Sequence, residues 1–378
     1  MRLVVHIGAT KTASTYLQKC LGINEELLRK HGVYLARAGR RSSASNLNHH
    51  NLAWQLLEDR RFRKADGDWE AFRDEVADVE ADAVVLSSEA FARLASEERL
   101  RATMSGRLFE IADDVSLVYV VRDPLARINS MYTQTVKTFA NPDSFDEYAT
   151  KSVKSGFYNL EESFRFWYQG NRATFVAIRF DEFVRLGPLQ SLLRVLNVEI
   201  PSEDLTIPDD VSNPSPGPTA VEAIRLLNAH LRVIDPDFSR RSAATSKLSQ
   251  IAQRRASKAG WSDERFWGWE PDRAVWAANR LANSNERFSQ SVWGTSWPMS
   301  VPIKKPKTAV TLLDTSPKAM KTIDSYVASM TKRYINLVYK RPDAESDDDD
   351  QSDDFAVDSD EAERAAQTMG RAKRKRQD

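Results

Sequence analysis

A turn rich in hydroxyl groups lies near the N-terminus and has the composition of an anion-binding site. It is segment 6–17, which reads HIGATKTASTYL, and it follows an apolar strand predicted at 2–7. Free backbone N–H groups and the helix dipole attract anions where a strand turns into a helix. Lys11 adds a mobile positive charge, and hydroxyl donors follow at Thr12, Ser14 and Thr15. The spacing predicts a phosphate-binding loop.

The loop does not match the Walker A motif of nucleoside triphosphatases. That motif needs a second glycine directly before its lysine. Here Ala9 and Thr10 lie between Gly8 and Lys11. The sequence therefore argues against a nucleoside triphosphate site, and the alternative for this segment is an ordinary strand-to-helix connection.

A second candidate site follows the clearest strand of the chain, predicted at 115–121. Segment 120–130 reads VVRDPLARINS, so Arg122 leaves the end of that strand. A guanidinium is always charged, and its planar fork matches phosphate oxygens. Ser130 on the following helix could donate a further hydrogen bond. Taken alone, the Arg-Asp-Pro sequence could also be an ion pair and a turn.

Together, these two segments resemble the bacterial type of sulfotransferase that uses 3′-phosphoadenosine-5′-phosphosulfate (PAPS). The first resembles the 5′-phosphosulfate loop, which in the family begins His-Ile-Gly and continues Lys-Thr-Gly-Thr-Thr. The matching residues are Lys11, Thr12, Ser14 and Thr15, whereas Ala13 stands where the family usually has glycine. The second resembles the 3′-phosphate element, with Arg122 and Ser130. The resemblance covers residues 1–200 and, more loosely, 213–294.

This resemblance implies transfer of a sulfuryl group from PAPS to a hydroxyl or amine of a small-molecule or glycan acceptor, such as a carbohydrate or glycolipid. The expected donor-binding residues are Lys11, Thr12, Ala13, Ser14, Thr15, Arg122 and Ser130. Lys11 would also stabilise charge on the bridging oxygen. No metal is expected, since no residues have the spacing of metal ligands and the chemistry requires none.

The base that activates the acceptor is expected to be Glu89. It follows a buried strand predicted at 82–87 and would emerge at the carboxyl edge of the sheet, where open α/β sheets bind ligands. Similar bacterial sulfotransferases carry Ser-Glu at this place, although Glu89 could also be an ordinary carboxylate of a first helical turn. His49 and His50 are expected to bind the acceptor and are the alternative bases, because histidine titrates near neutral pH.

Strands alternate with helices through the first 180 residues. Besides the three strands above, one is predicted at 174–178, and helices are predicted at 14–31 and 158–169. This order indicates an α/β fold with a central parallel sheet between layers of helices, and the resemblance implies a P-loop NTPase-like arrangement. Further helices are predicted at 219–232 and 316–340, with an exposed helix or loop at 240–260.

The expected division is a sulfotransferase domain over 1–300, a helical extension over 301–342 and a disordered acidic and basic tail over 343–378. The tail carries 13 acidic and 6 basic residues, a net charge of −7, and the rest of the chain carries +7. A mildly basic body suits an anionic ligand. Composition of this kind cannot form a packed core in the tail.

Cys20 is the only cysteine, which fits a reducing compartment. No apolar run is long enough to span a membrane. These features predict a cytoplasmic protein without a membrane span. No nucleic-acid partner is expected, and the oligomeric state is open.

Two other functions remain open from the sequence. One is a P-loop-like nucleotide or sugar kinase, against which the missing Gly-Lys pair argues. The other is a non-catalytic nucleotide- or glycan-binding protein on the same fold, for which Ala13 is the main argument. A tryptophan-rich stretch offers Trp261, Trp267 and Trp269 for stacking on a sugar ring, although a core role suits tryptophan as well.

Overall fold

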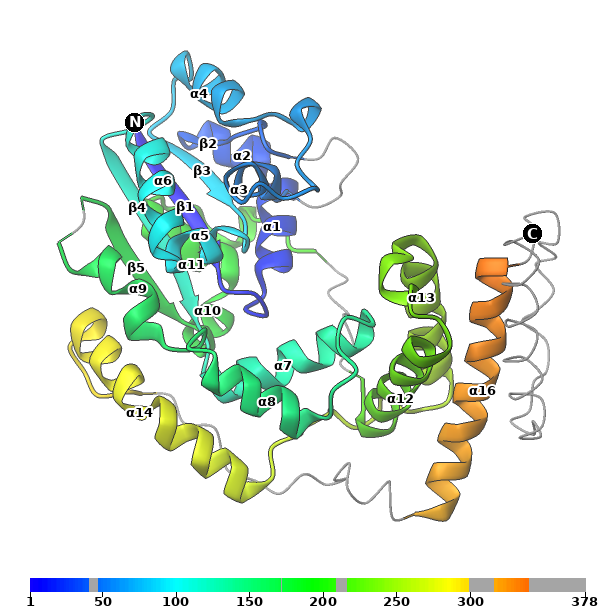
Figure 1. The fold of residues 1–378 in the computed structure, drawn as a ribbon. Coiled ribbons are helices and arrows are strands. Elements are labelled where there is room, and N and C mark those ends of the chain that lie inside the picture. The colour runs from blue at the N-terminus through cyan, green and yellow to red at the C-terminus, as the bar shows by residue number, and fades with distance from the viewer. Residues whose placement is uncertain (41–46, 171, 209–215, 299–315, 340–378) are drawn as a thin grey trace. The chain divides into compact units, whose positions relative to one another are not determined.

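The computed structural model describes residues 1–40, 47–170, 172–208, 216–298 and 316–339 (Figure 1). Its centre is a sheet of five parallel strands in the order β2-β3-β1-β4-β5. The strands are β1 (Arg2–Gly8), β2 (Val33–Leu35), β3 (Ala83–Ser87), β4 (Asp114–Val121) and β5 (Thr174–Arg179). The four strands predicted from sequence are present. The fifth, β2, spans 3 residues and is too short to give a pattern.

Both faces of the sheet are buried, which explains why its strands are continuous apolar runs. In β1, the side chains of Leu3, Val5 and Ile7 pack into one core and that of Val4 packs into the other. The first core is covered by α3 (His50–Leu56), α4 (Trp69–Ala77), α5 (Phe91–Ser96), α6 (Glu98–Phe109) and α9 (Leu160–Tyr168). The second is covered by α1 (Ser14–Ile23), α2 (Glu25–Lys30), α10 (Phe180–Leu186) and α11 (Pro188–Leu196). The predicted α/β class with a parallel sheet between helices is confirmed.

The helix predicted over 14–31 is two helices, α1 and α2, that meet at Asn24. The side-chain nitrogen of Asn24 donates to the carbonyls of Cys20 and Thr206, both at 2.8 Å. Its side-chain oxygen accepts from the backbone N–H of Thr206, also at 2.8 Å. Asparagine side chains compete with the helical backbone for hydrogen bonds, so the chain breaks here and is fastened to a distant segment.

The chain divides into two compact units, each built from three separate stretches. Among the described residues, the first contains the sheet and takes residues from 1–127, 155–208 and 278–298, and the second takes residues from 128–154, 216–277 and 316–339. The domain boundaries expected from the sequence, with one domain over 1–300, stay a prediction. The remaining long helices are α7 (Pro124–Lys137), α8 (Phe145–Lys154), α12 (Pro218–Ile234), α13 (Ser242–Lys258), α14 (Pro271–Trp293) and α16 (Pro317–Tyr339). Of these, α7 and α14 contribute residues to both units. The expected tail, 343–378, and segment 301–315 lie outside the described residues.

A buried carboxylate ties three helical segments of the second unit together. Asp235 accepts hydrogen bonds from Tyr334 Oη at 2.6 Å and from Arg241 Nε at 2.8 Å.

Trp269, one of the three tryptophans considered for sugar stacking, is 1% exposed and meets the ring of Phe145 edge-on, with ring centroids 5.1 Å apart. Trp269 is thus a core residue and not a platform for a sugar.

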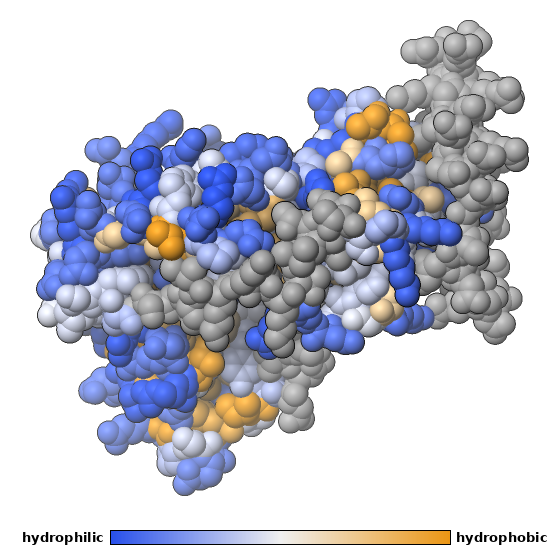
Figure 2. Space-filling model, turned by 90° about the horizontal axis from the view of Figure 1, so that it is seen from below, coloured by the Kyte–Doolittle hydropathy of each residue, from blue (hydrophilic) through white to orange (hydrophobic). Residues whose placement is uncertain are grey.

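The surface is mostly polar. Figure 2 shows one face on which apolar side chains form small groups among hydrophilic ones. The large apolar side chains that are exposed come from distant parts of the sequence, for example Ile23, Val184 and Val233. In the portion of the chain that the structure describes, no helix is both long and apolar enough to cross a lipid bilayer.

Candidate active site

The predicted phosphate loop joins β1 to α1 through several left-handed backbone positions. Gly8 has φ 105°, Lys11 has φ 66° and Ala13, the N-cap of α1, has φ 62°. For a residue with a Cβ this conformation costs roughly 1–2 kcal/mol. Strain of this kind persists where the surrounding structure enforces it, and it concentrates at functional sites. The position at which the resembling family has glycine therefore has the backbone conformation that favours glycine.

Two of the predicted donor hydroxyls brace this loop from within. Thr12 Oγ1 donates to the carbonyl of Ala9 at 2.5 Å, and Ser14 Oγ donates to the same carbonyl at 3.1 Å. Both side chains are buried, whereas Thr15 is exposed. A hydroxyl has one proton to donate, so Thr12 and Ser14 already donate their hydroxyl protons to the carbonyl of Ala9. Backbone N–H groups, Lys11 and Thr15 are then the donors that the loop can offer to an anion.

The second predicted motif meets the first at the carboxyl edge of the sheet, because β4 is the direct neighbour of β1. Arg122 Nη1 donates to the carbonyl of Lys11 at 2.7 Å, and its guanidinium lies 4.9 Å from the ring centroid of Phe180. Burial lowers the pKa of Arg122, and the carboxylate of Asp123 opposes that shift. Arginine stays charged despite such a shift, so a half-buried cation lies against the loop.

Ser130 lies further along α7, in the second unit, and is half-buried. Its carbonyl accepts the hydroxyl of Thr133 at 2.9 Å. The predicted hydrogen bond from the Ser130 hydroxyl to a phosphate stays a prediction.

Glu89 lies directly beside the loop. A Cβ placed on Gly8 would be 3.2 Å from the Cα of Glu89, so the two backbones are in contact. The carboxylate is held on one oxygen, Oε2, which lies 3.2 Å from Gln18 Nε2 and 3.7 Å from His50 Nε2. The side chain of Glu89 is 17% exposed and that of His50 is 26% exposed. A partly exposed carboxylate next to a basic loop has the placement of a general base.

The two predicted acceptor histidines have different surroundings. His49 is buried, with Nδ1 accepting the N–H of Ser87 at 3.0 Å and Nε2 lying 2.8 Å from the carbonyl of Ala36. Burial lowers the pKa of His49 to about 4, so the ring is neutral and serves as a structural link. His50 is accessible, and its Nδ1 lies 2.5 Å from Ser88 Oγ. Contact with an acceptor is therefore possible for the partly exposed side chain of His50 but not for the buried ring of His49.

A polar network under the loop includes residues that sequence reasoning missed. Ser87 Oγ lies 2.8 Å from His6 Nδ1 and 3.2 Å from Gln18 Nε2. His6 is fully buried, burial lowers its pKa to about 4, and the charge of Glu89 opposes that shift. The sequence feature that could have indicated this network was Gln18, a polar residue beside Leu17 on the buried face of α1.

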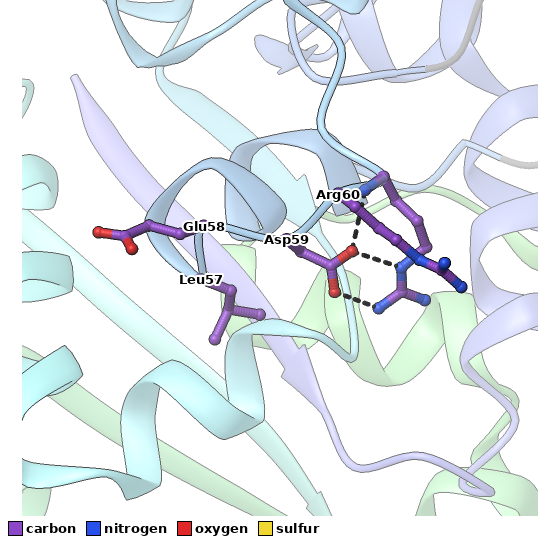
Figure 3. Close-up of a pocket in the computed structure, with 5 residues that line it drawn as sticks. Leu57, Glu58, Asp59 and Arg60 are labelled. Carbon is purple, nitrogen blue, oxygen red and sulfur yellow. Dashed lines mark hydrogen bonds and ion pairs between the residues drawn. The ribbon is translucent and has the colours of Figure 1, made fainter.

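A surface hollow lies at the other end of α3. Its lining residues are Leu57, Glu58, Asp59, Arg60 and Arg61 (Figure 3). Arg61 donates from Nε and Nη2 to the two carboxylate oxygens of Asp59, at 2.9 and 2.7 Å, and Glu58 points away from this pair in Figure 3. The two charges satisfy each other, so this hollow lacks the reactive groups that surround Glu89.

The loop, Arg122 and Glu89 form one constellation with a basic side and a carboxylate side. Such a constellation can bind an anionic group and remove a proton from a neighbouring hydroxyl or amine. Within the described residues, no three histidine, cysteine, aspartate or glutamate side chains gather as metal ligands.

No protein-family model, curated protein or solved structure matches this chain.

Proposed function

We propose that this protein is a PAPS-dependent sulfotransferase with a P-loop NTPase-like catalytic unit. The observation that carries the proposal is the hydrogen bond from Arg122 Nη1 to the carbonyl of Lys11, 2.7 Å long. It joins two segments that are 111 positions apart in the chain and that, by their resemblance to the family, would bind the two phosphate ends of one donor. The pairing of β1 with β4 brings the two segments to the same edge of the sheet, and this hydrogen bond places the guanidinium against the loop.

In the proposed reaction, two segments of this chain bind the donor. The loop 8–14 binds the phosphosulfate end of the donor through backbone N–H groups, and Arg122 binds the 3′-phosphate with its charged fork. Lys11 and Ala13 have a left-handed backbone conformation in this loop, and strained backbone of this kind concentrates at functional sites. These features fit PAPS better than a nucleoside triphosphate, because Ala9 and Thr10 replace the glycine that a Walker A loop requires.

Transfer of the sulfuryl group breaks the bond between sulfur and the bridging oxygen and forms a bond between sulfur and the acceptor oxygen or nitrogen. The electron pair of the broken bond stays on the phosphate, where Lys11 would stabilise the developing charge. The proton of the acceptor passes to the carboxylate of Glu89. Glu89 is adjacent to Gly8, so base and loop are close enough to serve one reaction centre.

The acceptor is proposed to be a carbohydrate or glycolipid that enters past His50. The ring of His50 lies 5.4 Å from that of Trp54, and an imidazole offers hydrogen bonds to sugar hydroxyls. The single cysteine, Cys20, is buried and free, which suits the cytoplasmic location that we propose.

The decisive measurement is calorimetric titration of 3′-phosphoadenosine-5′-phosphate (PAP), the donor without its sulfuryl group. Wild type should bind PAP with a Kd in the micromolar range or tighter and should bind AMP more weakly, because AMP lacks the 3′-phosphate. Arg122→Ala should lose about 10- to 100-fold in PAP affinity, since a charged hydrogen bond contributes about 1.5–3 kcal/mol.

Arg194→Ala is the matched control, because Arg194 is exposed on α11 and should leave PAP affinity unchanged. Preference for ATP over PAP, or equal affinity for PAP and AMP, would contradict the proposal and favour a kinase. Tight PAP binding without turnover on a broad panel of acceptors would favour a non-catalytic binding protein.

A further inference from the structure

The carboxylate of Glu89 has a defined orientation because two side chains reach the same oxygen. Gln18 Nε2 lies 3.2 Å from Oε2, and His50 Nε2 lies 3.7 Å from it. An ionised carboxylate only accepts hydrogen bonds, so the amide nitrogen of Gln18 must face it. The other oxygen, Oε1, takes part in neither contact.

Gln18 is itself anchored. It is 2% exposed, and its amide nitrogen also lies 3.2 Å from Ser87 Oγ. The imidazole of His6, with Nδ1 2.8 Å from the same hydroxyl, is neutral because burial lowers its pKa to about 4. Ser87 can therefore accept from Gln18 and donate to His6, and both amide hydrogens of Gln18 are used. The amide has no freedom to turn away from Glu89 without losing a buried hydrogen bond.

The same helix carries the loop and this amide. Ser14, the first residue of α1, braces the loop through Ala9, and Gln18 follows four positions later on the same helical face. A rigid turn of helix thus connects the group that shapes the loop to the group that holds the carboxylate.

We infer that Gln18 is a positioning residue: it fixes Oε2 of Glu89 so that Oε1 faces the acceptor as the proton-accepting atom. This inference rests on the proposed function, in which Glu89 is the base. Gln18 does not touch the reacting atoms and acts only through the orientation of Glu89.

The contact can be tested without any activity. In protein with ¹⁵N-labelled glutamine side chains, one amide pair should be absent from the NMR spectrum of Gln18→Met, which identifies the Gln18 signals. These signals should move in Glu89→Gln, because Glu89 is the direct partner of the amide. Gln18 signals that stay in place in Glu89→Gln would overturn the inference.

The positioning role is tested by the slow hydrolysis of PAPS, measured as release of labelled sulfate with water as the acceptor. Gln18→Met keeps the volume and apolar packing of the side chain but donates nothing, and it should lower this rate about 10- to 100-fold. In Gln18→Glu the new carboxyl can donate only when protonated, so the loss should be smallest at low pH and grow as the pH rises. Lys19→Met, a neighbour on α1 outside the site, should behave as wild type.

The affinity for PAP distinguishes a failure of the proposed function from a failure of the positioning role of Gln18. Wild type that does not bind PAP defeats the proposed function, whatever the glutamine signals show. Normal PAP binding, with hydrolysis that depends on Glu89 but is unchanged in Gln18→Met, defeats the positioning role alone. An equal loss in Gln18→Met and Gln18→Glu at every pH would assign Gln18 a purely structural role and would also overturn the inference.

Discussion

At the scale of single residues, the placement of Glu89 beside Gly8 makes this proposed base the first target for mutagenesis. Glu89→Gln preserves the shape of the side chain and still offers an oxygen to Gln18, but it cannot take up a proton at neutral pH. We expect turnover to fall about 100- to 10,000-fold, the range that general base catalysis contributes, while PAP affinity stays at the wild-type value.

Turnover assays with and without the substitution, combined with calorimetric titration of PAP, check this expectation. Glu98→Gln is the control, because Glu98 is exposed in the first turn of α6 and should have no effect. Turnover within a few-fold of wild type in Glu89→Gln would exclude Glu89 as the base and leave His50 as the candidate.

Ala13 gives a second prediction at this scale. Its φ of 62° is strained for alanine and free of strain for glycine, so Ala13→Gly should raise the free energy of unfolding by about 0.5–1 kcal/mol. The same change at Ala102, an exposed position within α6, should lower it by about 0.5–1 kcal/mol.

Urea unfolding measures the change in the free energy of unfolding, which should be positive for Ala13→Gly and negative for Ala102→Gly. PAP titration shows whether Ala13→Gly keeps the wild-type affinity. A lower stability of Ala13→Gly would mean that the methyl group of Ala13 forms packing contacts worth more than the backbone strain.

The sequence could predict those residues of the site that lie within recognisable motifs. The loop residues, Arg122 and Glu89 were all singled out, and the structure brings them together. Gln18 and Ser87 were not, because each looks ordinary beside its sequence neighbours and gains meaning only from the pairing of β1 with β3. The difference between His49 and His50 depends on which ring turns inward, which the dipeptide itself does not reveal.

At the scale of elements, His6 and His49 fasten the ends of β1 and α3 to Ser87 at the end of β3. Burial lowers the pKa of each to about 4 from an ordinary value of 6.5. The unfolded chain therefore takes up these protons first as the pH falls. The free energy of unfolding should therefore be highest above pH 6.5, where both histidines are neutral in the folded and the unfolded chain. It should fall progressively between pH 6.5 and 4, by about 3 kcal/mol for His49.

Urea unfolding at several pH values in this window measures the loss. His49→Asn should be less stable than wild type at pH 7 but should show a shallower pH dependence, since one titrating group is gone. His31→Gln, at an exposed position, should keep the wild-type slope. Equal slopes in wild type and His49→Asn would show that His49 does not titrate with unfolding.

The elements themselves were largely predictable, because four strands are long apolar runs and the main helices have clear periodicity. The failures have local causes. β2 has 3 residues, and the break at Asn24 depends on hydrogen bonds to Thr206, 182 positions away. A window of sequence contains neither the partner nor the reason for the break.

At the scale of the whole molecule, the tail over 343–378 lies outside the described residues, and its role is predicted from charge alone. Its net charge of −7 would repel an anionic donor if the tail approached the site. We expect deletion of 343–378 to leave PAP affinity and the unfolding midpoint unchanged at physiological salt, where charges more than about 8 Å apart are screened.

Calorimetry and urea unfolding of the shortened protein test this expectation, with wild type measured in the same buffer. A large change in PAP affinity would assign the tail to the working enzyme.

The interleaving of the two units has a consequence for how the protein must be made. Phe288 and Trp293 of α14 belong to the sheet-bearing unit: Phe288 is fully buried in its core, and Trp293 donates to the carbonyl of Ala177 at 2.9 Å. A ribosome therefore releases the last part of the sheet-bearing unit only after it has synthesised the middle stretch of the other unit. Until then the nascent sheet lacks part of its cover, so the first unit cannot complete its core before Phe288 and Trp293 have been synthesised.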